Sequence, residues 1–197
     1  MKAALIVFVK NLVPGGVKTR LAATLGHEEA MKAYRYLLKH TQQVAGAVQA
    51  DKYIFYSNAI EDQGWPKSYN HYVQQGPDLG QRMAWAFEKV FSLGYKKVVI
   101  IGSDCLELQA TLLTQAFDEL ESHDVVLGPA NDGGYYLLGL TQSRPELFQG
   151  MAWSTPAVLS QTLHACRQAA LATSLLPSLT DIDEAEDWLQ AKKGLYE

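Results

Sequence analysis

The sequence predicts an α/β fold, a three-layer αβα sandwich with a mainly parallel central sheet. Short apolar runs rich in β-branched residues alternate along the chain with longer segments whose apolar residues recur every three to four positions. Such alternation is typical of parallel strands connected by helices. The run at 98–101, Val-Val-Ile-Ile, has the composition of a strand that is buried on both faces. With 197 residues, we expect the chain to form a single domain over 1–197.

The first half of the chain opens with a fully apolar segment at 3–9, which predicts a central strand. A Gly-rich loop at 10–21 follows it. The segment 27–48 carries Ala, Met, Tyr, Leu and Val at helical spacing, so we expect a helix that covers one face of the sheet. Further strands are expected at 52–56 and 72–75, separated by a polar segment that contains proline.

Helix starts in the second half are indicated by candidate capping residues. Asp78 precedes a helix that runs to about residue 93, Ser154 precedes one at 156–170, and Asp183 precedes a terminal helix. Helical spacing also predicts a helix at 111–121. Short strands are expected at 98–101, 125–127, directly after 131–134, and at 175–176.

Composition excludes several classes of protein. Hydrophobic residues make up 48% and charged residues 19%, which is ordinary for a globular chain and not for a disordered one. The net charge of -4 argues against a general attraction to nucleic acid or to an anionic membrane. The two cysteines form neither a disulfide framework nor a paired zinc spacing. The apolar start is too short to span a membrane and lacks a cleavage site, so we expect a cytoplasmic protein.

The Gly-rich loop at 10–21 carries three cations, Lys10, Lys18 and Arg20. A loop of this kind after a first strand can direct backbone N–H groups and positive side chains towards phosphate. It is not a Walker A loop, because Val17 and not glycine precedes Lys18. The alternative is an exposed turn whose charges are solvated.

Asp104 is the first charged residue after the strand at 98–101. In an open parallel sheet, ligands bind beyond the carboxyl ends of the strands, so a carboxylate at this position is placed for chemistry. Alternatively, Asp104 caps the following helix or closes a turn. The Asn-Asp-Gly-Gly sequence at 131–134 also has a functional and a structural interpretation. It can contribute to a site, or it can form a tight hairpin.

The short motifs of the chain, and the order in which they occur, resemble those of the nucleotide-diphospho-sugar transferase superfamily, the GT-A type fold. The resemblance is strongest to its small bacterial branch of glycosyltransferase-like proteins, the DUF2064 family. It covers residues 5 to about 188. The matching motifs are Val17–Leu21, Asp78–Met83, Gly102–Asp104, Gly128–Pro129 with Asp132–Tyr136, Trp153–Thr155 and Asp181–Asp183.

The resemblance implies a nucleotide at the strand ends and a divalent cation, Mg²⁺ or Mn²⁺, held by Asp104. Asp183 would be the second metal ligand, with Asp181 as the less favoured choice. Such a cation neutralises the charges of a nucleoside di- or triphosphate. One departure lies beside this site: Leu106 occupies a position where the family usually has proline, which predicts a reshaped turn after Asp104.

The resemblance also implies roles in binding and catalysis. Lys18 and Arg20 would contact the phosphates and stabilise the charge that develops on the leaving diphosphate. Asp132 would orient an acceptor hydroxyl or act as the base. The base, sugar and acceptor would be bordered by Gln75, Asp78, Leu79, Gly80, Gly133, Gly134, Tyr135 and Trp153.

Three functions stay open on the sequence. The first is a metal-dependent glycosyltransferase that uses a nucleotide-diphosphate sugar and a small-molecule acceptor. The second is a nucleotidyltransferase, in which a substrate phosphate attacks the α-phosphate of a nucleoside triphosphate and pyrophosphate is released. The third is a non-catalytic domain that binds a nucleotide or a protein partner. Fold-level analogy supports the first two, so the site itself has to distinguish them.

Overall fold

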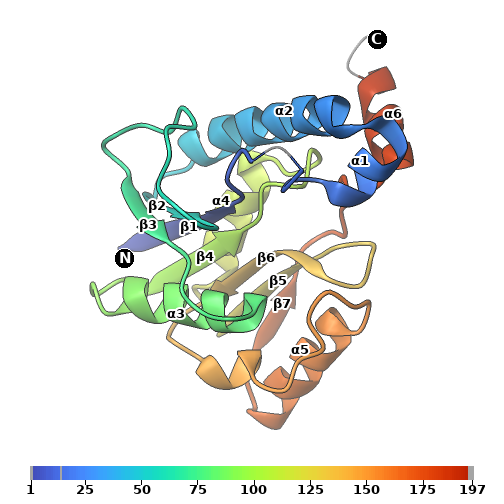
Figure 1. Ribbon diagram of the computed structural model, residues 1–197. Coiled ribbons are helices and arrows are strands. Elements are labelled where there is room, and N and C mark those ends of the chain that lie inside the picture. Colours follow the sequence, from blue (N-terminus) through green and yellow to red (C-terminus); the bar gives the residue numbers. More distant parts are fainter. Residues whose placement is uncertain (1, 14, 195–197) are drawn as a thin grey trace.

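The computed structural model describes residues 2–13 and 15–194, and within this part of the chain a seven-stranded sheet lies between two layers of helices (Figure 1). The three-layer α/β fold predicted from the sequence is confirmed. Residues 1, 14 and 195–197 lie outside the described residues, and with them Pro14 of the Gly-rich loop.

The strands are β1 (Ala3–Val9), β2 (Asp51–Tyr56), β3 (Asn70–Val73), β4 (Lys97–Ile101), β5 (Val125–Pro129), β6 (Tyr135–Leu140) and β7 (Thr173–Leu175). The helices are α1 (Thr19–Leu25), α2 (His27–Gly46), α3 (Leu79–Phe91), α4 (Ala110–Glu119), α5 (Val158–Gln168) and α6 (Ala185–Gly194), with a short 3₁₀ helix, η1, at Pro145–Phe148.

The sheet order is β3-β2-β1-β4-β6-β5-β7. Within it, β6 pairs antiparallel with β4 and β5, whereas the pairs β1·β2, β1·β4, β2·β3 and β5·β7 are parallel. The loop at 130–134 therefore connects an antiparallel pair, as the hairpin interpretation of its sequence predicted. Because β1, β4 and β5 point the same way and β6 begins where they end, the loops at 10–18, 102–109 and 130–134 meet at one edge of the sheet.

Each face of the sheet has its own apolar core, because successive strand residues point to opposite faces. Leu5 and Val7 of β1 pack on the face that α2 and α4 cover, whereas Ala4 and Ile6 pack on the face that α3 and α5 cover. Figure 1 shows these two helix layers on opposite sides of the strands. The two cores hold the sheet rigidly, and with it the loop positions at its carboxyl edge.

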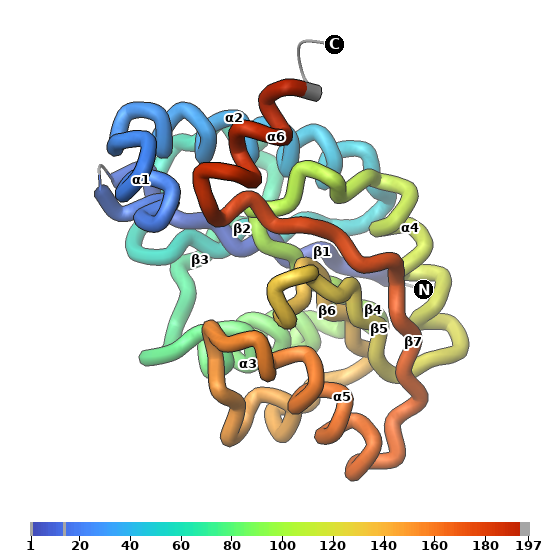
Figure 2. Tube along the Cα trace, turned by 90° about the vertical axis from the view of Figure 1, so that its right-hand side faces the viewer, coloured from blue at the N-terminus to red at the C-terminus, as the bar shows by residue number. Residues whose placement is uncertain are grey.

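A third apolar cluster joins the two ends of the chain. Leu21 of α1 and Leu37 of α2 pack with Ile182 and with Trp188 of α6. The chain reaches α6 through an extended segment, residues 176–184, that runs from β7 across the carboxyl edge of the sheet (Figure 2). Leu106 packs against the same cluster, so the residue that replaces the family's usual proline fills an apolar contact.

Three local predictions were wrong. The loop predicted at 10–21 already becomes α1 at Thr19, and Gly26, at φ 84°, separates this helix from α2. Ser154 does not cap α5, which begins at Val158 without a side-chain cap. Asp183 was expected to cap the last helix. Instead, the carboxylate of Asp187 accepts hydrogen bonds there from the backbone N–H groups of Asp183 and Glu184.

Candidate active site

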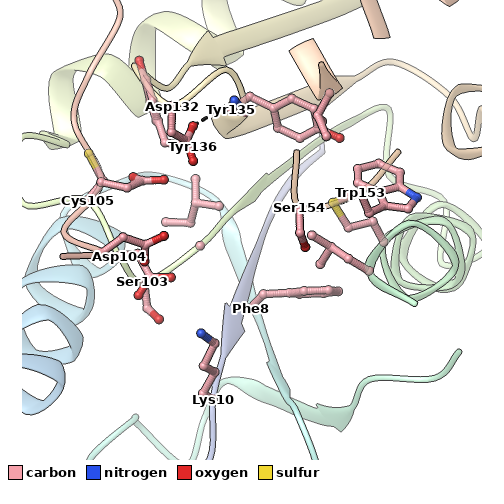
Figure 3. A pocket seen from close by; sticks show the side chains of 18 of the residues that line it. Phe8, Lys10, Ser103, Asp104, Cys105, Asp132, Tyr135, Tyr136, Trp153 and Ser154 are labelled. Atoms are coloured by element: carbon pink, nitrogen blue, oxygen red, sulfur yellow. Dashed lines mark hydrogen bonds between the residues drawn. The ribbon is translucent and has the colours of Figure 1, made fainter. Parts of the chain in front are cut away.

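A cleft of about 770 Å³ lies at the carboxyl edge of the sheet, beyond the ends of β1 and β4 (Figure 3). The loop after β1, the loop after β4 and the loop at 130–134 contribute to its lining. The 176–184 segment adds two acidic residues, and the N-terminal parts of α3 and α5 form the opposite side. The cleft lies where open α/β sheets bind their ligands.

One buried ammonium organises the charged side of the cleft. Nζ of Lys18 lies 2.5 Å from Oδ1 of Asp104 and 3.2 Å from Oδ1 of Asp183. The Lys18 side chain is 1% exposed, compared with 28% for Asp104 and 46% for Asp183. Arg20 lies farther out, with Nη1 4.0 Å from Oδ2 of Asp183. The structure thus brings together four of the residues for which the sequence predicted phosphate or metal contacts.

The backbone of Lys18 adopts a left-handed conformation, with φ 48° and ψ 50°, directly before α1. Residues with a Cβ rarely adopt this conformation, which costs about 1–2 kcal/mol. Ser154, with φ 62°, is a second non-glycine residue in this region, and it also lines the cleft. Of the three such residues in the described part of the chain, two therefore lie in the cleft, as is typical of functional sites.

The ion pairs determine the protonation states of this group. Burial opposes the charge of Lys18, but the nearby carboxylates of Asp104 and Asp183 outweigh it and raise its pKa. Burial also opposes ionisation of Asp104, yet the Lys18 ammonium, assisted by Lys10, lowers the pKa of this carboxyl group. Both groups are therefore charged at neutral pH.

Asp181 lines the cleft beside this group. Burial, and after it the negative charge of Asp104, raises the pKa of Asp181 to about 7. Its segment is tied to the rest of the site through backbone contacts: the N–H of Ile182 donates to the carbonyl of Asp104 at 2.8 Å, and the N–H of Thr180 donates to Oε2 of Glu107 at 2.7 Å. The segment 176–184 therefore fixes Asp181 and Asp183 next to the end of β4.

The opposite side of the cleft is aromatic and apolar, with Phe8, Tyr135 and Trp153 among its lining residues (Figure 3). Met83 is a further apolar residue of the lining. Trp153 stacks on Phe148, with ring centroids 6.4 Å apart, and its indole covers Gly80 so closely that a Cβ there would overlap it. Tyr135 contributes its ring, whereas its hydroxyl is buried.

The loop at 130–134 holds Asp132 at the cleft. Oδ1 of Asp132 accepts a hydrogen bond from the N–H of Gly134 at 2.8 Å, and the aspartate itself is exposed. Gly133 has φ 90°, and a Cβ there would overlap the backbone of Pro156, so this glycine packs the loop against the start of α5. The loop thus presents one carboxylate to the cleft from a firmly packed turn.

Some residues that the sequence predicted to border the base, the sugar or the acceptor do not line the cleft. Gln75, Asp78, Gly80 and Gly133 are absent from the lining of the cleft, within the part of the chain that the structure describes. Asp78 caps α3, since Oδ1 accepts the N–H of Gln81 at 2.8 Å. Leu79, Gly134, Tyr135 and Trp153 do line the cleft.

Gln74 and Arg82 line the cleft where Gln75 was expected. The Gln74 amide donates to the carbonyl of Phe55 at 2.9 Å, and Nε of Arg82 donates to the carbonyl of Gly76 at 2.9 Å. Adjacent residues of an extended chain point to opposite sides, so a shift of one position exchanges the two glutamines. Sequence reasoning also missed Phe8 and gave Lys10 no role beyond its loop. Their position at the end of the first strand could have indicated that Phe8 and Lys10 line the cleft.

Cys105 follows Asp104 but is no nucleophile. Burial raises the pKa of its thiol to about 12, so almost no thiolate forms at neutral pH. Its Sγ faces the carbonyl of Thr180 at 3.5 Å, so Cys105 fills a small buried space between the loop after β4 and the 176–184 segment.

The cleft offers two carboxylates as ligands for a divalent cation. In the described residues, no group of three or more His, Cys, Asp and Glu side chains is arranged to hold a metal ion. However, Asp104 and Asp183 direct one oxygen each at the same cation, Nζ of Lys18. Mg²⁺ typically binds one or two carboxylates and completes its shell with water and phosphate oxygens. The pair Asp104 and Asp183 fits such a cation, if phosphates supply further ligands.

Comparisons with known proteins agree with this fold. Residues 39–155 match a family described as "Uncharacterized protein conserved in bacteria (DUF2064)". A crystal structure of a protein from Desulfovibrio desulfuricans G20, assigned provisionally as a nucleotide-diphospho-sugar transferase, is 34% identical and superposes with a TM-score of 0.87. The match covers 93% of this chain and 84% of that one. The chain belongs to the DUF2064 family. This confirms the resemblance predicted from the motifs.

More distant structures share the fold alone. The inositol-1-phosphate CTP transferase from T. maritima is 14% identical, with a TM-score of 0.60 and coverage of 95% of this chain and 91% of that chain. Rv0371c from Mycobacterium tuberculosis H37Rv, solved in complex with manganese, is 11% identical, with a TM-score of 0.60 and coverage of 96% of both chains. The curated protein sequences contain no match to this chain. None of the described helices is long and apolar enough to cross a membrane.

Proposed function

We propose that the chain is a metal-dependent transferase that binds the diphosphate of a nucleotide sugar in this cleft and moves the glycosyl group to a small-molecule acceptor. The observation that carries the proposal is the convergence of Lys18, Asp104 and Asp183 beyond the ends of β1 and β4. The 34% identical protein from Desulfovibrio desulfuricans, with its provisional assignment as a nucleotide-diphospho-sugar transferase, supports the same class of reaction.

The charged side of the cleft would bind the diphosphate. Lys18 and Arg20 lie at the start of α1 and would contact its phosphate oxygens, as a point charge and as a planar fork. Asp104 and Asp183 would hold Mg²⁺ or Mn²⁺, and the manganese complex of the similarly folded Rv0371c supports this choice of cation. The bound cation would neutralise charge on the leaving diphosphate.

The remaining lining residues would hold the sugar and the acceptor. Trp153 and Tyr135 offer apolar ring surfaces, and Leu79 and Gly134 border the same space. Asp132 would accept the proton of the acceptor hydroxyl as that oxygen bonds to the anomeric carbon. The bond between this carbon and the phosphate oxygen breaks, and the nucleoside diphosphate leaves with its electron pair.

A nucleotidyl transfer is the second candidate, because the fold is shared with the inositol-1-phosphate CTP transferase of T. maritima. In this reaction, a phosphate of the second substrate attacks the α-phosphorus of a nucleoside triphosphate, and pyrophosphate leaves. The same lysine and arginine would then contact the triphosphate, and the same two aspartates would hold the cation that neutralises its charge.

Calorimetry of the purified chain with nucleotides tests both candidates. The panel consists of UDP, GDP, ADP, CDP, dTDP and the matching triphosphates, each with and without Mn²⁺ or Mg²⁺. We expect one base to bind only when the metal is present, and Asp104→Asn to abolish this binding. A preference for the diphosphate supports glycosyl transfer; a preference for the triphosphate, followed by release of pyrophosphate, supports nucleotidyl transfer. If no nucleotide binds in any combination, both proposals fail and a non-catalytic role replaces them.

A further inference from the structure

The two carboxylates that suit a metal ion already share a cation that belongs to the chain. Nζ of Lys18 lies 2.5 Å from Asp104 and 3.2 Å from Asp183, and the Lys18 side chain is almost completely buried. Ligand oxygens of Mg²⁺ lie at about 2.0–2.1 Å from the ion. An ammonium group and a divalent cation therefore cannot occupy the space between the same two carboxylates together.

Lys18 is suited to leave this position. Its ammonium is a point charge on a flexible four-carbon chain, which can take another direction without movement of the backbone. Lys18 also lines the cleft, on the side where Arg20 and Lys10 add positive charge. The phosphate oxygens of a bound nucleotide would offer the ammonium a new partner within the same cleft.

We propose that Lys18 is an exchangeable counter-ion of the metal site, which occupies the Asp104–Asp183 pair until a divalent cation displaces it towards the phosphates of the nucleotide. The inference rests on the proposed function, since it takes the metal and the phosphates from there. It adds a coupling between the binding events: the free protein holds its two metal ligands together with a lysine, the divalent cation displaces this lysine, and the phosphates of the nucleotide hold it away from the metal.

Two consequences follow from this exchange. Metal and nucleotide bind cooperatively, because the metal releases Lys18 for the phosphates and the phosphates draw Lys18 away from the metal. By linkage, each ligand strengthens the other by the same factor, and such couplings are typically about 5- to 150-fold. In addition, Lys18 weakens the binding of the metal in the absence of nucleotide, although the lysine is not itself a metal ligand.

The first test is a titration of Mn²⁺ alone into the wild type, Lys18→Met and Lys10→Met, followed by calorimetry. Lys10 is a matched control, because it lines the same cleft and acts on Asp104 through its charge but has no ion pair among the described residues. We expect Lys18→Met to lower the Kd of Mn²⁺ on the order of tenfold, and Lys10→Met to change it by less than about threefold. Equal effects of the two substitutions would reduce Lys18 to a general electrostatic influence and overturn the exchange.

The second test uses the wild type only, because Lys18→Met leaves Asp104 without its partner and can impair folding. Acetic anhydride acetylates accessible lysines, and mass spectrometry gives the rate at each one, with exposed Lys32 as the internal standard. We expect Mn²⁺ to increase the acetylation of Lys18 several-fold relative to Lys32, and the preferred nucleoside diphosphate with Mn²⁺ to suppress it again. If Mn²⁺ binds and the acetylation of Lys18 stays constant, the lysine does not move and the inference is wrong.

The outcomes separate this inference from the proposed function. Nucleotide binding that is independent of Mn²⁺, with Lys18 protected from acetylation by the nucleotide alone, would mean that the lysine replaces the metal. That result overturns the exchange but leaves a transferase possible. Failure of every nucleotide to bind removes the proposed function, and a lack of Mn²⁺ binding in all three proteins removes both the metal site and the exchange.

Discussion

The two sides of the cleft are built in opposite ways. On the charged side, Lys18, Asp104 and Asp183 come from three distant parts of the chain and are held by ion pairs around one buried ammonium. On the aromatic side, Trp153 stacks on Phe148 and covers Gly80 in close contact. The first side gathers charge around one ammonium that is shielded from water, and the second side removes apolar surface from water.

The difference assigns different tasks to the two sides. Buried charges contribute little net stability, because the loss of hydration offsets their attraction, and their arrangement is expensive to disturb. The left-handed backbone of Lys18 adds a further cost on this side. The aromatic side stabilises the fold through burial and close packing. We therefore expect substitutions on the charged side to change ligand binding and stability together, and those on the aromatic side to change stability first.

Asp104→Asn should have the largest effect. It leaves the buried Lys18 ammonium with only the half-exposed Asp183, and removal of one partner of a buried ion pair costs about 3 kcal/mol of unfolding free energy. Urea denaturation of the metal-free protein measures this loss. Asp183→Asn is the matched comparison, because it removes the other partner of the same ammonium at a more exposed position, and its cost should stay below about 1 kcal/mol. Equal losses in the two variants would contradict the central role given to Asp104.

Gly80→Ala tests the aromatic side. The added Cβ overlaps the indole of Trp153, and we expect a loss of about 2 kcal/mol in spite of the better helix propensity of alanine. In a Trp153→Ala background the same substitution should become neutral or slightly stabilising, which a double-mutant cycle would measure. Gly46→Ala serves as the control, because it lies in α2 and its Cβ has open space apart from the hydroxyl of Tyr69 at 4.0 Å. A full loss from Gly80→Ala without Trp153 would show that another contact is responsible.

The fold was predictable because local patterns alone determine most of it. The strand at 98–101 is apolar throughout, and the buried strand β4 occupies Lys97–Ile101. The position of Asp104 followed from the same pattern, since ligands collect beyond strand ends. The loop after the first strand, with Lys18, was expected at the same edge for the same reason. These inferences needed only the spacing of apolar residues along the sequence and the direction of the strands.

The contacts across the cleft were not predictable in this way. Lys18 and Asp183 are separated by 165 positions, and they meet only because the 176–184 segment crosses the sheet edge. Gly80 was assigned to the nucleotide by its motif, but its space is filled by Trp153, which lies far along the chain. The choice between Gln74 and Gln75 depended on the residue at which an extended segment ends, and composition does not determine this.

The pH dependence of stability should distinguish Asp181 from Asp104. The pKa of Asp181 is raised to about 7, so the native state keeps a proton that the unfolded state has already lost. Stability therefore falls as the pH rises, by on the order of 2 kcal/mol between about pH 5 and about pH 7. Asp104, whose pKa is lowered, stabilises the native state at pH values above the ordinary aspartate range, and this stabilisation is lost as the pH falls through its native pKa. Its titration therefore adds no slope between about pH 5 and about pH 7.

Urea denaturation at a series of pH values, in the presence of EDTA, measures this slope. Asp181→Asn keeps the size of the side chain and removes its titration, so the curve should become flatter over the same interval. A slope that is unchanged in Asp181→Asn would transfer the effect to another group.

The smallest effect is expected from Asp78→Ala, which tests the role of this residue at the start of α3. Asp78 accepts the N–H of Gln81 and is absent from the lining of the cleft, so its loss should lower the free energy of unfolding by about 1 kcal/mol through the helix cap of α3. Asp78→Asn keeps a capping oxygen and should cost only a few tenths of this. Neither substitution should change nucleotide affinity by more than about twofold, whereas a direct contact with the base would weaken it far more through an unpaired polar group. A large loss of affinity at full stability would therefore return Asp78 to the nucleotide site and extend the charged side of the cleft to the start of α3.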